Sequence, residues 1–218
     1  MKKTVFSVLL LTLSVCAQGQ EKQSATRLED LNVQFMMRGY FFAGSRIPDR
    51  QAPGGFGQSD NYPKAIVPIM PVTRGMVSLI ADTSETPAFN GKYRGLRVLL
   101  VNGTNEIVGF SASDSRLYIV QEARGLDGKW KPIEYLPSSW CGNSYHTVFL
   151  GPKQYWEFAA PRYNGKIKTR LRIRLEWQKS QFQKLTIYSN EFDGSVNAKQ
   201  FTVQQGHQPT NIMDPYNN

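Results

Sequence analysis

One segment of the chain alternates cationic and apolar side chains in a way that could bind an anionic partner. From Lys166 to Trp177 the sequence reads KIKTRLRIRLEW. Successive side chains of a β-strand point to opposite faces, so this period predicts an apolar row facing a core and a row of cations facing away from it. The predicted binding residues in that outer row are Lys166, Lys168, Arg170, Arg172 and Arg174.

Cations in such a row lie about 7 Å apart along the strand and repel one another. Two interpretations follow. The row could be a strip that binds a polyanion, or it could be a solvated strand face neutralised by carboxylates on flanking strands. Glu122, Glu134 and Glu157 are the candidates for that neutralisation.

A second candidate for binding is Trp140, because the residues around it, from Pro137 to Asn143, are typical of a loop. An exposed loop tryptophan could stack on a sugar or anchor a protein partner, whereas a buried one would cap the end of the core. The other tryptophans, Trp130, Trp156 and Trp177, fall within predicted strands. We expect these three rings to fill the core.

Cys141 and His146 form the one thiol and imidazole pair that lies close together in the sequence. Nucleophilic cysteine chemistry needs a base that activates the thiol and a third group that orients the base, a part that Asn143 could play. No family signature surrounds Cys141, so a buried, unreactive thiol is the simpler interpretation. No catalytic residue is therefore predicted, and whether the chain is an enzyme stays open.

The sequence predicts no metal ion and no other cofactor. His146 and His207 are the two histidines, and no zinc-type spacing of His and Cys occurs. The acidic segment from Glu191 to Gly194 lacks the repeated ligands of a calcium loop and is interpreted as a turn. No glycine-rich phosphate loop is present. Glycoside hydrolysis requires two carboxylates, which this chain could supply, and it remains an alternative.

The first seventeen residues have the pattern of a signal for export. Lys2 and Lys3 precede an apolar run from Val5 to Val15, and Ala17 stands where a signal peptidase would cleave. The run is too short to span a membrane, and no second run of spanning length follows. We expect a periplasmic or extracellular protein; lipid attachment at Cys16 is the alternative. After cleavage Cys141 would be the only cysteine, which excludes an internal disulfide.

The net charge of +9 favours acidic partners. Removal of the signal would lower this charge to about +7. In an exported protein the expected partners are anionic polysaccharide, lipid headgroups or acidic envelope proteins, and nucleic acid is not expected. The sequence does not indicate the oligomeric state.

From residue 76 onward, short β-branched and aromatic runs alternate with turn residues, which is typical of a sandwich or barrel. The predicted strands are Met76–Ala81, Leu96–Asn102, Leu117–Ala123, Trp130–Tyr135, Thr147–Leu150, Tyr155–Ala159, Ile167–Trp177, Leu185–Ser189 and Gln200–Val203. Asn90-Gly91, Asp127-Gly128 and Asn164-Gly165 are expected to form tight turns between consecutive antiparallel strands.

The predicted organisation has four parts: a signal peptide at 1–17, an irregular segment at 18–75, a β-sandwich at 76–205 and a polar tail at 206–218. Residues 24–35 give the one hint of a short helix. Residues 43–63 are rich in Gly, Pro and Ser and are expected to form a mobile loop. Pro63, Pro68 and Pro71 exclude a central strand between residues 64 and 72.

The run from Met76 to Thr202 resembles an immunoglobulin-like β-sandwich of exported bacterial proteins. Leu96–Gly103, Tyr155–Phe158 and Lys166–Trp177 carry the resemblance, which covers just over half of the chain. Antibody-type domains pair two cysteines across their sheets, so the similarity is to the cysteine-free relatives. The resemblance implies an all-β, antiparallel sandwich and no particular activity.

From these observations we expect an exported, non-enzymatic binding or structural module of the bacterial cell envelope. Contact with an anionic polymer through the basic strand face is the mode of binding that the sequence favours. A hydrolase of extracellular or envelope polysaccharide, and a carbohydrate-binding domain using Trp140, are the alternatives.

Overall fold

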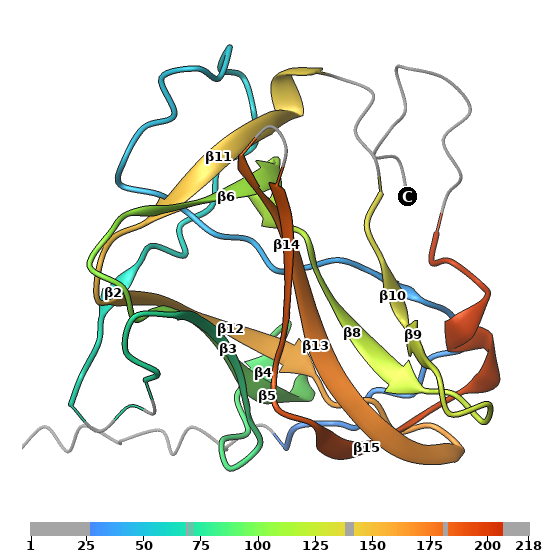
Figure 1. The fold of residues 1–218 in the computed structure, drawn as a ribbon. Coiled ribbons are helices and arrows are strands. Elements are labelled where there is room, and N and C mark those ends of the chain that lie inside the picture. The colour runs from blue at the N-terminus through green and yellow to red at the C-terminus, as the bar shows by residue number, and fades with distance from the viewer. Residues whose placement is uncertain (1–26, 69, 71, 138–141, 181–182, 207–218) are drawn as a thin grey trace, which may run out of the picture.

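The computed structural model describes residues 27–68, 70, 72–137, 142–180 and 183–206, and this part of the chain is an all-β fold (Figure 1). The strands are β1 (Met37–Arg38), β2 (Lys64–Ala65), β3 (Val77–Asp82), β4 (Ala88–Phe89), β5 (Tyr93–Asn102), β6 (Val108–Ser113), β7 (Arg116–Leu117), β8 (Ile119–Arg124), β9 (Trp130–Pro132), β10 (Glu134–Tyr135), β11 (Tyr145–Leu150), β12 (Gln154–Pro161), β13 (Ile167–Ser180), β14 (Gln183–Tyr188) and β15 (Phe192–Val196). Two short 3-10 helices are η1 (Gly142–Ser144) and η2 (Ala198–Phe201). Neither of these described helices has the length and apolar character needed to cross a membrane.

Two antiparallel sheets form the layers of the predicted β-sandwich. In the first sheet the strand order is β2-β12-β5-β3, with β4 paired to β5. In the second sheet the order is β14-β13-β8-β9, and β15 pairs with the first half of β13. A smaller sheet, β11-β6-β7, and the parallel pair β1-β10 complete the fold. In Figure 1 the strands β13 and β14 pass in front of β12 and β3. The immunoglobulin-like topology itself stays a prediction.

The alternating pattern of β13 is confirmed. Leu171, Ile173, Leu175 and Trp177 are buried in the main core, and the cations between them lie on the outer face. From the first sheet, Leu100 and Trp156 belong to the same core, and both are fully buried. The sandwich is therefore held by apolar side chains that a period of two places between the layers.

The outer face of the first sheet is also covered, which explains why β5 is buried on both faces. Leu99, Val101 and Tyr155 form a second, smaller cluster against Ile66 and neighbouring apolar side chains of the segment around residues 66–72. The prolines of this segment limit β2 to two residues at the edge of the sheet, as the sequence predicts.

The part of the predicted N-terminal segment that the structure describes packs as part of the sandwich. Leu31, Phe41 and Ala43 are buried in the main core, although only β1 and β2 are regular strands there. The short helix suggested for residues 24–35 is wrong in its described part, from residue 27. There Glu29 and Leu31 make isolated bridges to Tyr93 and Tyr163 instead.

Two of the predicted tight turns are confirmed, and one is not. Asn90 and Gly91 have φ angles of 48° and 68° between β4 and β5, and Gly128, with φ of 74°, lies in the hairpin between β8 and β9. Asn164-Gly165, however, connects β12 to β13, which belong to different sheets. The chain crosses between the layers here, so the hairpin predicted between these two strands is wrong.

Three further differences concern short elements. The strand predicted at Gln200–Val203 is largely the 3-10 helix η2, in which the backbone of Asn197 and the side chain of Gln200 hydrogen-bond at 2.8 Å. The strands β6 and β15 were not predicted, since Gly and Ser interrupt their apolar pattern. The predicted signal at 1–17 and residues 207–218 of the predicted tail lie outside the described residues.

Candidate functional site

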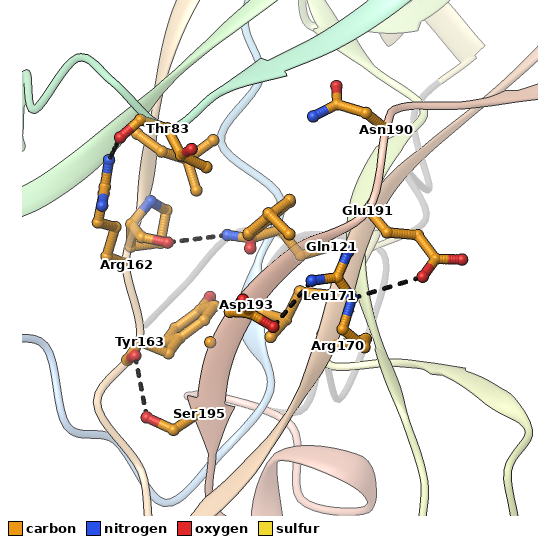
Figure 2. A pocket seen from close by; sticks show the side chains of 14 residues that line it. Thr83, Gln121, Arg162, Tyr163, Arg170, Leu171, Asn190, Glu191, Asp193 and Ser195 are labelled. Atoms are coloured by element: carbon orange, nitrogen blue, oxygen red, sulfur yellow. Dashed lines mark hydrogen bonds and ion pairs between the residues drawn. The ribbon is translucent and has the colours of Figure 1, made fainter.

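A cavity of about 500 Å³ opens where the end of β12 faces β13 and β15 (Figure 2). Arg162 and Tyr163, directly after β12, form one wall, and Arg170, Asp193 and Ser195 form the opposite wall. Leu96 of β5 and Gln121 of β8 lie between them, so both sheets of the sandwich contribute to the lining. Ligand sites commonly occupy such junctions between structural layers.

Arg162 fixes the first wall through backbone carbonyl groups. Its Nε donates a 2.8 Å hydrogen bond to the carbonyl of Gly95, and its Nη2 donates to the carbonyls of Thr83 and, at 3.0 Å, Glu85. The guanidinium group presents several donors in one plane, and these three acceptors hold that plane. The connection after β3 is thereby fastened to the end of β12.

The opposite wall is built on the pairing of β13 with β15, which places Arg170 directly across from Asp193. The two side chains form an ion pair of 2.8 Å, and Glu191 lies 3.5 Å from the same guanidinium. The hydrogen bond to Asp193 raises the pKa of Arg170. At the neighbouring position 194 a Cβ would lie 2.5 Å from Cδ1 of Leu171, so any larger residue there would displace the Leu171 side chain.

Gln121 and Tyr163 form the innermost part of the lining. The Nε2 of Gln121 (labelled in Figure 2) donates to the carbonyl of Pro161 at 3.0 Å and also lies 3.2 Å from the Glu134 carboxylate. Its Oε1 has no hydrogen-bond partner within the described part of the chain. Gln121 is fully buried, so its side chain forms part of the floor of the cavity.

Behind this lining lies a buried carboxylate, that of Glu134. The hydroxyl groups of Tyr40 and Tyr163 each donate a 2.6 Å hydrogen bond to it, and the backbone N–H of Gln121 donates another at 2.8 Å. Burial raises the pKa of Glu134, and these hydrogen bonds offset part of the rise. Burial also raises the pKa of both tyrosines. Glu134 is not part of the cavity wall, and it is connected to that wall through Gln121 and Tyr163.

The charges around the cavity balance. Arg162, Arg170, Glu191 and Asp193 all line it, so the lining contains two cations and two carboxylates. Both carboxylates are held by the Arg170 guanidinium, an arrangement that fixes charge and does not prepare a proton for transfer. The arrangement suits a neutral ligand whose groups both donate and accept hydrogen bonds.

Four of the five predicted cations lie on the outer face of β13 and Lys166 directly precedes this strand, but the structure separates the five into two sets. Lys166 and Lys168 are exposed, and neither makes an ion pair within the described residues. Arg170 pairs with Asp193, while Arg172 and Arg174 both lie 2.8 Å from the carboxylate of Glu122. Arg174 also pairs with Glu176. The arginines are therefore neutralised, and a continuous polyanion strip has no support here.

Of the three glutamates expected to neutralise this face, only Glu122 does so. The register of β8 and β13 places it opposite Arg172. Glu157 instead pairs with Lys64 and Arg97 in the first sheet, and Glu134 is in the buried network. A one-strand pattern shows which side chains share a face, but not which strand lies beside it.

The tryptophans are only partly where the sequence places them. Trp156 and Trp177 are in the core, but the prediction for Trp130 is wrong, because its ring lies on the outer face of the second sheet. The guanidinium of Arg172 lies between the rings of Trp130 and Tyr188, at 4.4 and 3.8 Å from their centroids. Trp140 and Cys141 lie outside the described residues.

His146 is buried under the segment 43–63. Its ring stacks on Phe56 with 3.7 Å between centroids, and its Nδ1 lies 3.1 Å from the carbonyl of Ser144. The Oγ of Ser115 is 3.5 Å from Nε2, but it donates a shorter bond of 2.8 Å to the carbonyl of Gly57. This hydroxyl is engaged with the backbone, so the Ser115–His146 pair is structural.

Within the described ranges, no three His, Cys, Asp or Glu side chains gather where they could hold a metal ion. Comparisons of the chain with family models, with curated proteins and with solved structures found no significant match. The geometry of the cavity is therefore the basis on which a function is assigned.

Sequence reasoning identified Arg170 but missed the rest of the cavity. Glu191 and Asp193 were assigned to a turn, whereas Asp193 lies in β15 and pairs with β13. A usable signal was present, since Phe192 and Val196 are apolar residues four apart, and Phe192, Gly194 and Val196 face one side of the strand. Arg162 carried no comparable signal.

Proposed function

We propose that the protein is a non-enzymatic binding module that holds a neutral, hydroxyl-rich unit, such as a sugar residue, in the cavity between β12 and β15. The observation that supports this proposal is the balanced lining, in which two arginines and two carboxylates surround one cavity. A sugar hydroxyl donates one hydrogen bond and accepts others, so it can bridge an arginine and a carboxylate that already face each other.

The rigidity of the walls supports the same proposal. Arg162 is held by three backbone carbonyl groups, and Arg170 is held by Asp193 and Glu191. Groups fixed before binding lose little conformational freedom when the ligand arrives, which improves affinity. The export that the first seventeen residues predict belongs to this proposal, and it would place the module in the bacterial cell envelope with glycans as available ligands.

Calorimetric titration with a panel of neutral oligosaccharides tests the proposal. We expect saturable binding by at least one of them, and a loss of about tenfold or more in affinity for Asp193→Asn, which removes one charged acceptor. Asp193 is 91% exposed, so this variant should fold normally. Asp127→Asn is the matched control, because Asp127 is also an exposed, ion-paired aspartate but lies in the β8–β9 hairpin away from the cavity.

Two results would contradict the proposal. The first is the absence of binding to every neutral oligosaccharide in the panel. The second is binding that Asp193→Asn leaves unchanged, which would place the ligand elsewhere. Release of new reducing ends from a bound oligosaccharide would favour the hydrolase alternative, and this release is measured in the same samples.

A further inference from the structure

A second hollow, of about 550 Å³, adjoins the cavity on the side of the basic strand. It is lined by Lys168, Thr169, Arg170, Asp193, Gly194 and Ser195. The last four of these residues also line the cavity, so the two spaces meet across the Arg170–Asp193 ion pair. A ligand longer than one unit could therefore occupy both.

The two spaces differ in charge. The cavity has two arginines and two carboxylates, whereas the adjoining hollow has Lys168 and Arg170 against the single carboxylate of Asp193. Lys168 is exposed and makes no ion pair with the described residues. Lys166, the next residue on the same strand face, lies about 7 Å further along, given the repeat of a strand. The positive excess thus increases away from the cavity.

We infer that the ligand is an acidic glycan, whose neutral unit occupies the cavity and whose neighbouring, carboxylate-bearing unit lies over Lys168. This inference rests on the proposed function, since it extends the same site by one unit. The unpaired ammonium group of Lys168 attracts the carboxylate, and the Arg170–Asp193 pair marks the boundary between the neutral and acidic units. Arg172 and Arg174, on the other side of Arg170 along β13, are paired with glutamates and do not contact the proposed ligand.

An exposed ammonium group adds a limited amount to affinity, because water and salt screen it. We therefore expect an acidic oligosaccharide to bind several-fold more tightly at low salt than the same oligosaccharide with its carboxyl groups reduced to alcohols. The difference should disappear near 1 M salt, where the screening length falls to about 3 Å. The affinity of the reduced form should change little with salt.

The test compares an oligosaccharide of alternating glucuronate and neutral N-acetylglucosamine units with its carboxyl-reduced form in calorimetric titrations of the full chain. In Lys168→Gln the preference for the acidic form over the reduced form should be lost. Lys199→Gln is the control, because Lys199 is an exposed lysine on η2 that lines neither space.

The outcomes separate the two proposals. Binding of the reduced form, with an acid preference that depends on Lys168, supports both. Equal binding of both forms, or an acid preference that survives Lys168→Gln, overturns the acidic-glycan inference and leaves the proposed function standing. If neither oligosaccharide binds and the wider neutral panel also fails, the proposed function itself is overturned, and this inference falls with it.

Discussion

The Tyr163 hydroxyl donates a 2.6 Å hydrogen bond to the Glu134 carboxylate, while the Tyr163 side chain lines the cavity. One residue therefore connects the buried carboxylate network with the proposed binding site. Tyr40 donates an equivalent 2.6 Å bond to the same carboxylate oxygen but is not part of the cavity wall. The two tyrosines form a natural pair for separating stability from binding.

Tyr163→Phe and Tyr40→Phe should each lower the free energy of unfolding by about 1–3 kcal/mol, since each removes a hydrogen bond to a buried carboxylate. Urea unfolding measures this change. Tyr62→Phe is the control, because Tyr62 is exposed and its hydroxyl can bond to water. A wild-type urea midpoint for both Tyr163→Phe and Tyr40→Phe would show that the network does not stabilise the fold.

The raised pKa of Glu134 predicts a specific dependence of stability on pH. Burial raises this pKa above its value in the unfolded chain, so the folded state binds the proton more tightly. The contribution of Glu134 is therefore most favourable at low pH. It falls as the pH rises from the ordinary glutamate pKa through the raised value, and it is constant above that value.

Glu134→Gln removes this titration, so the stability difference between wild type and variant should change across that pH window and level off on both sides. The stability difference between wild type and variant is measured because other acids change the total stability with pH in the opposite direction. Asp82 is one of them, since a hydrogen bond from Ser84 lowers its pKa. Urea unfolding at a series of pH values gives the measurement. Glu106→Gln, at an exposed glutamate, is the matched control for loss of one carboxylate. A flat difference for Glu134→Gln would refute the assignment.

Arg172 should be sensitive even to a conservative replacement. Its guanidinium lies between the rings of Trp130 and Tyr188 and pairs with Glu122, whose side chain is only 7% exposed. Lysine keeps the charge but loses the planar stacking and the two-point contact, so Arg172→Lys should cost about 1–2 kcal/mol of stability. Arg94→Lys, in an exposed ion pair with Asp30, should change stability by less than about 0.5 kcal/mol. Equal effects in thermal unfolding would contradict the special role of the aromatic pair.

The sequence predicts those features of the fold that depend on neighbouring residues, and it misses those that depend on residues far apart in the chain. The alternation from Ile167 to Trp177 is local, and it correctly predicts a strand with its apolar side in the core. The cavity depends on long-range register: Arg170 meets Asp193 only because β13 pairs with β15.

Arg162 illustrates the same limit in the first sheet, since its side chain binds backbone carbonyl groups at positions 83, 85 and 95. A single sequence does not reveal which distant carbonyl groups will be near. The misassigned ring of Trp130 has a related cause. Trp130 lies in β9, the edge strand of the second sheet. An aromatic residue at such an edge can be stabilised by an arginine on the outer face instead of by the core.

The composition of residues 43–63 predicts a mobile loop, yet hydrogen bonds hold this segment to the sandwich at several points. Trp156 Nε1 donates to the carbonyl of Gly44 at 2.9 Å, the N–H of Thr147 donates to Asp49 at 2.7 Å, and Asn61 Nδ2 donates to the carbonyl of Glu157 at 3.0 Å. The N–H of Gly57 donates a 2.8 Å hydrogen bond to Asp114, and the carbonyl of Gly57 accepts one of 2.8 Å from Ser115. Next to it, Phe56 stacks on His146. Phe56 lies between the contacts at Asp49 and Asn61, so loss of its stacking should loosen this part of the segment without unfolding the sandwich.

Phe56→Ala should therefore increase tryptic cleavage after Arg46 and Arg50, both exposed residues of this segment, by about tenfold or more, while global stability falls by less than about 2 kcal/mol. Timed digestion followed by mass spectrometry locates the cuts. Leu126→Ala is the control, since Leu126 is 96% exposed at the tip of the β8–β9 hairpin. Rapid cleavage of the wild type at both arginines would instead favour the mobile loop that the composition predicts. If the wild type is protected and Phe56→Ala is cleaved no faster, the hydrogen bonds of the segment hold it without the Phe56 stack, and the prediction is wrong.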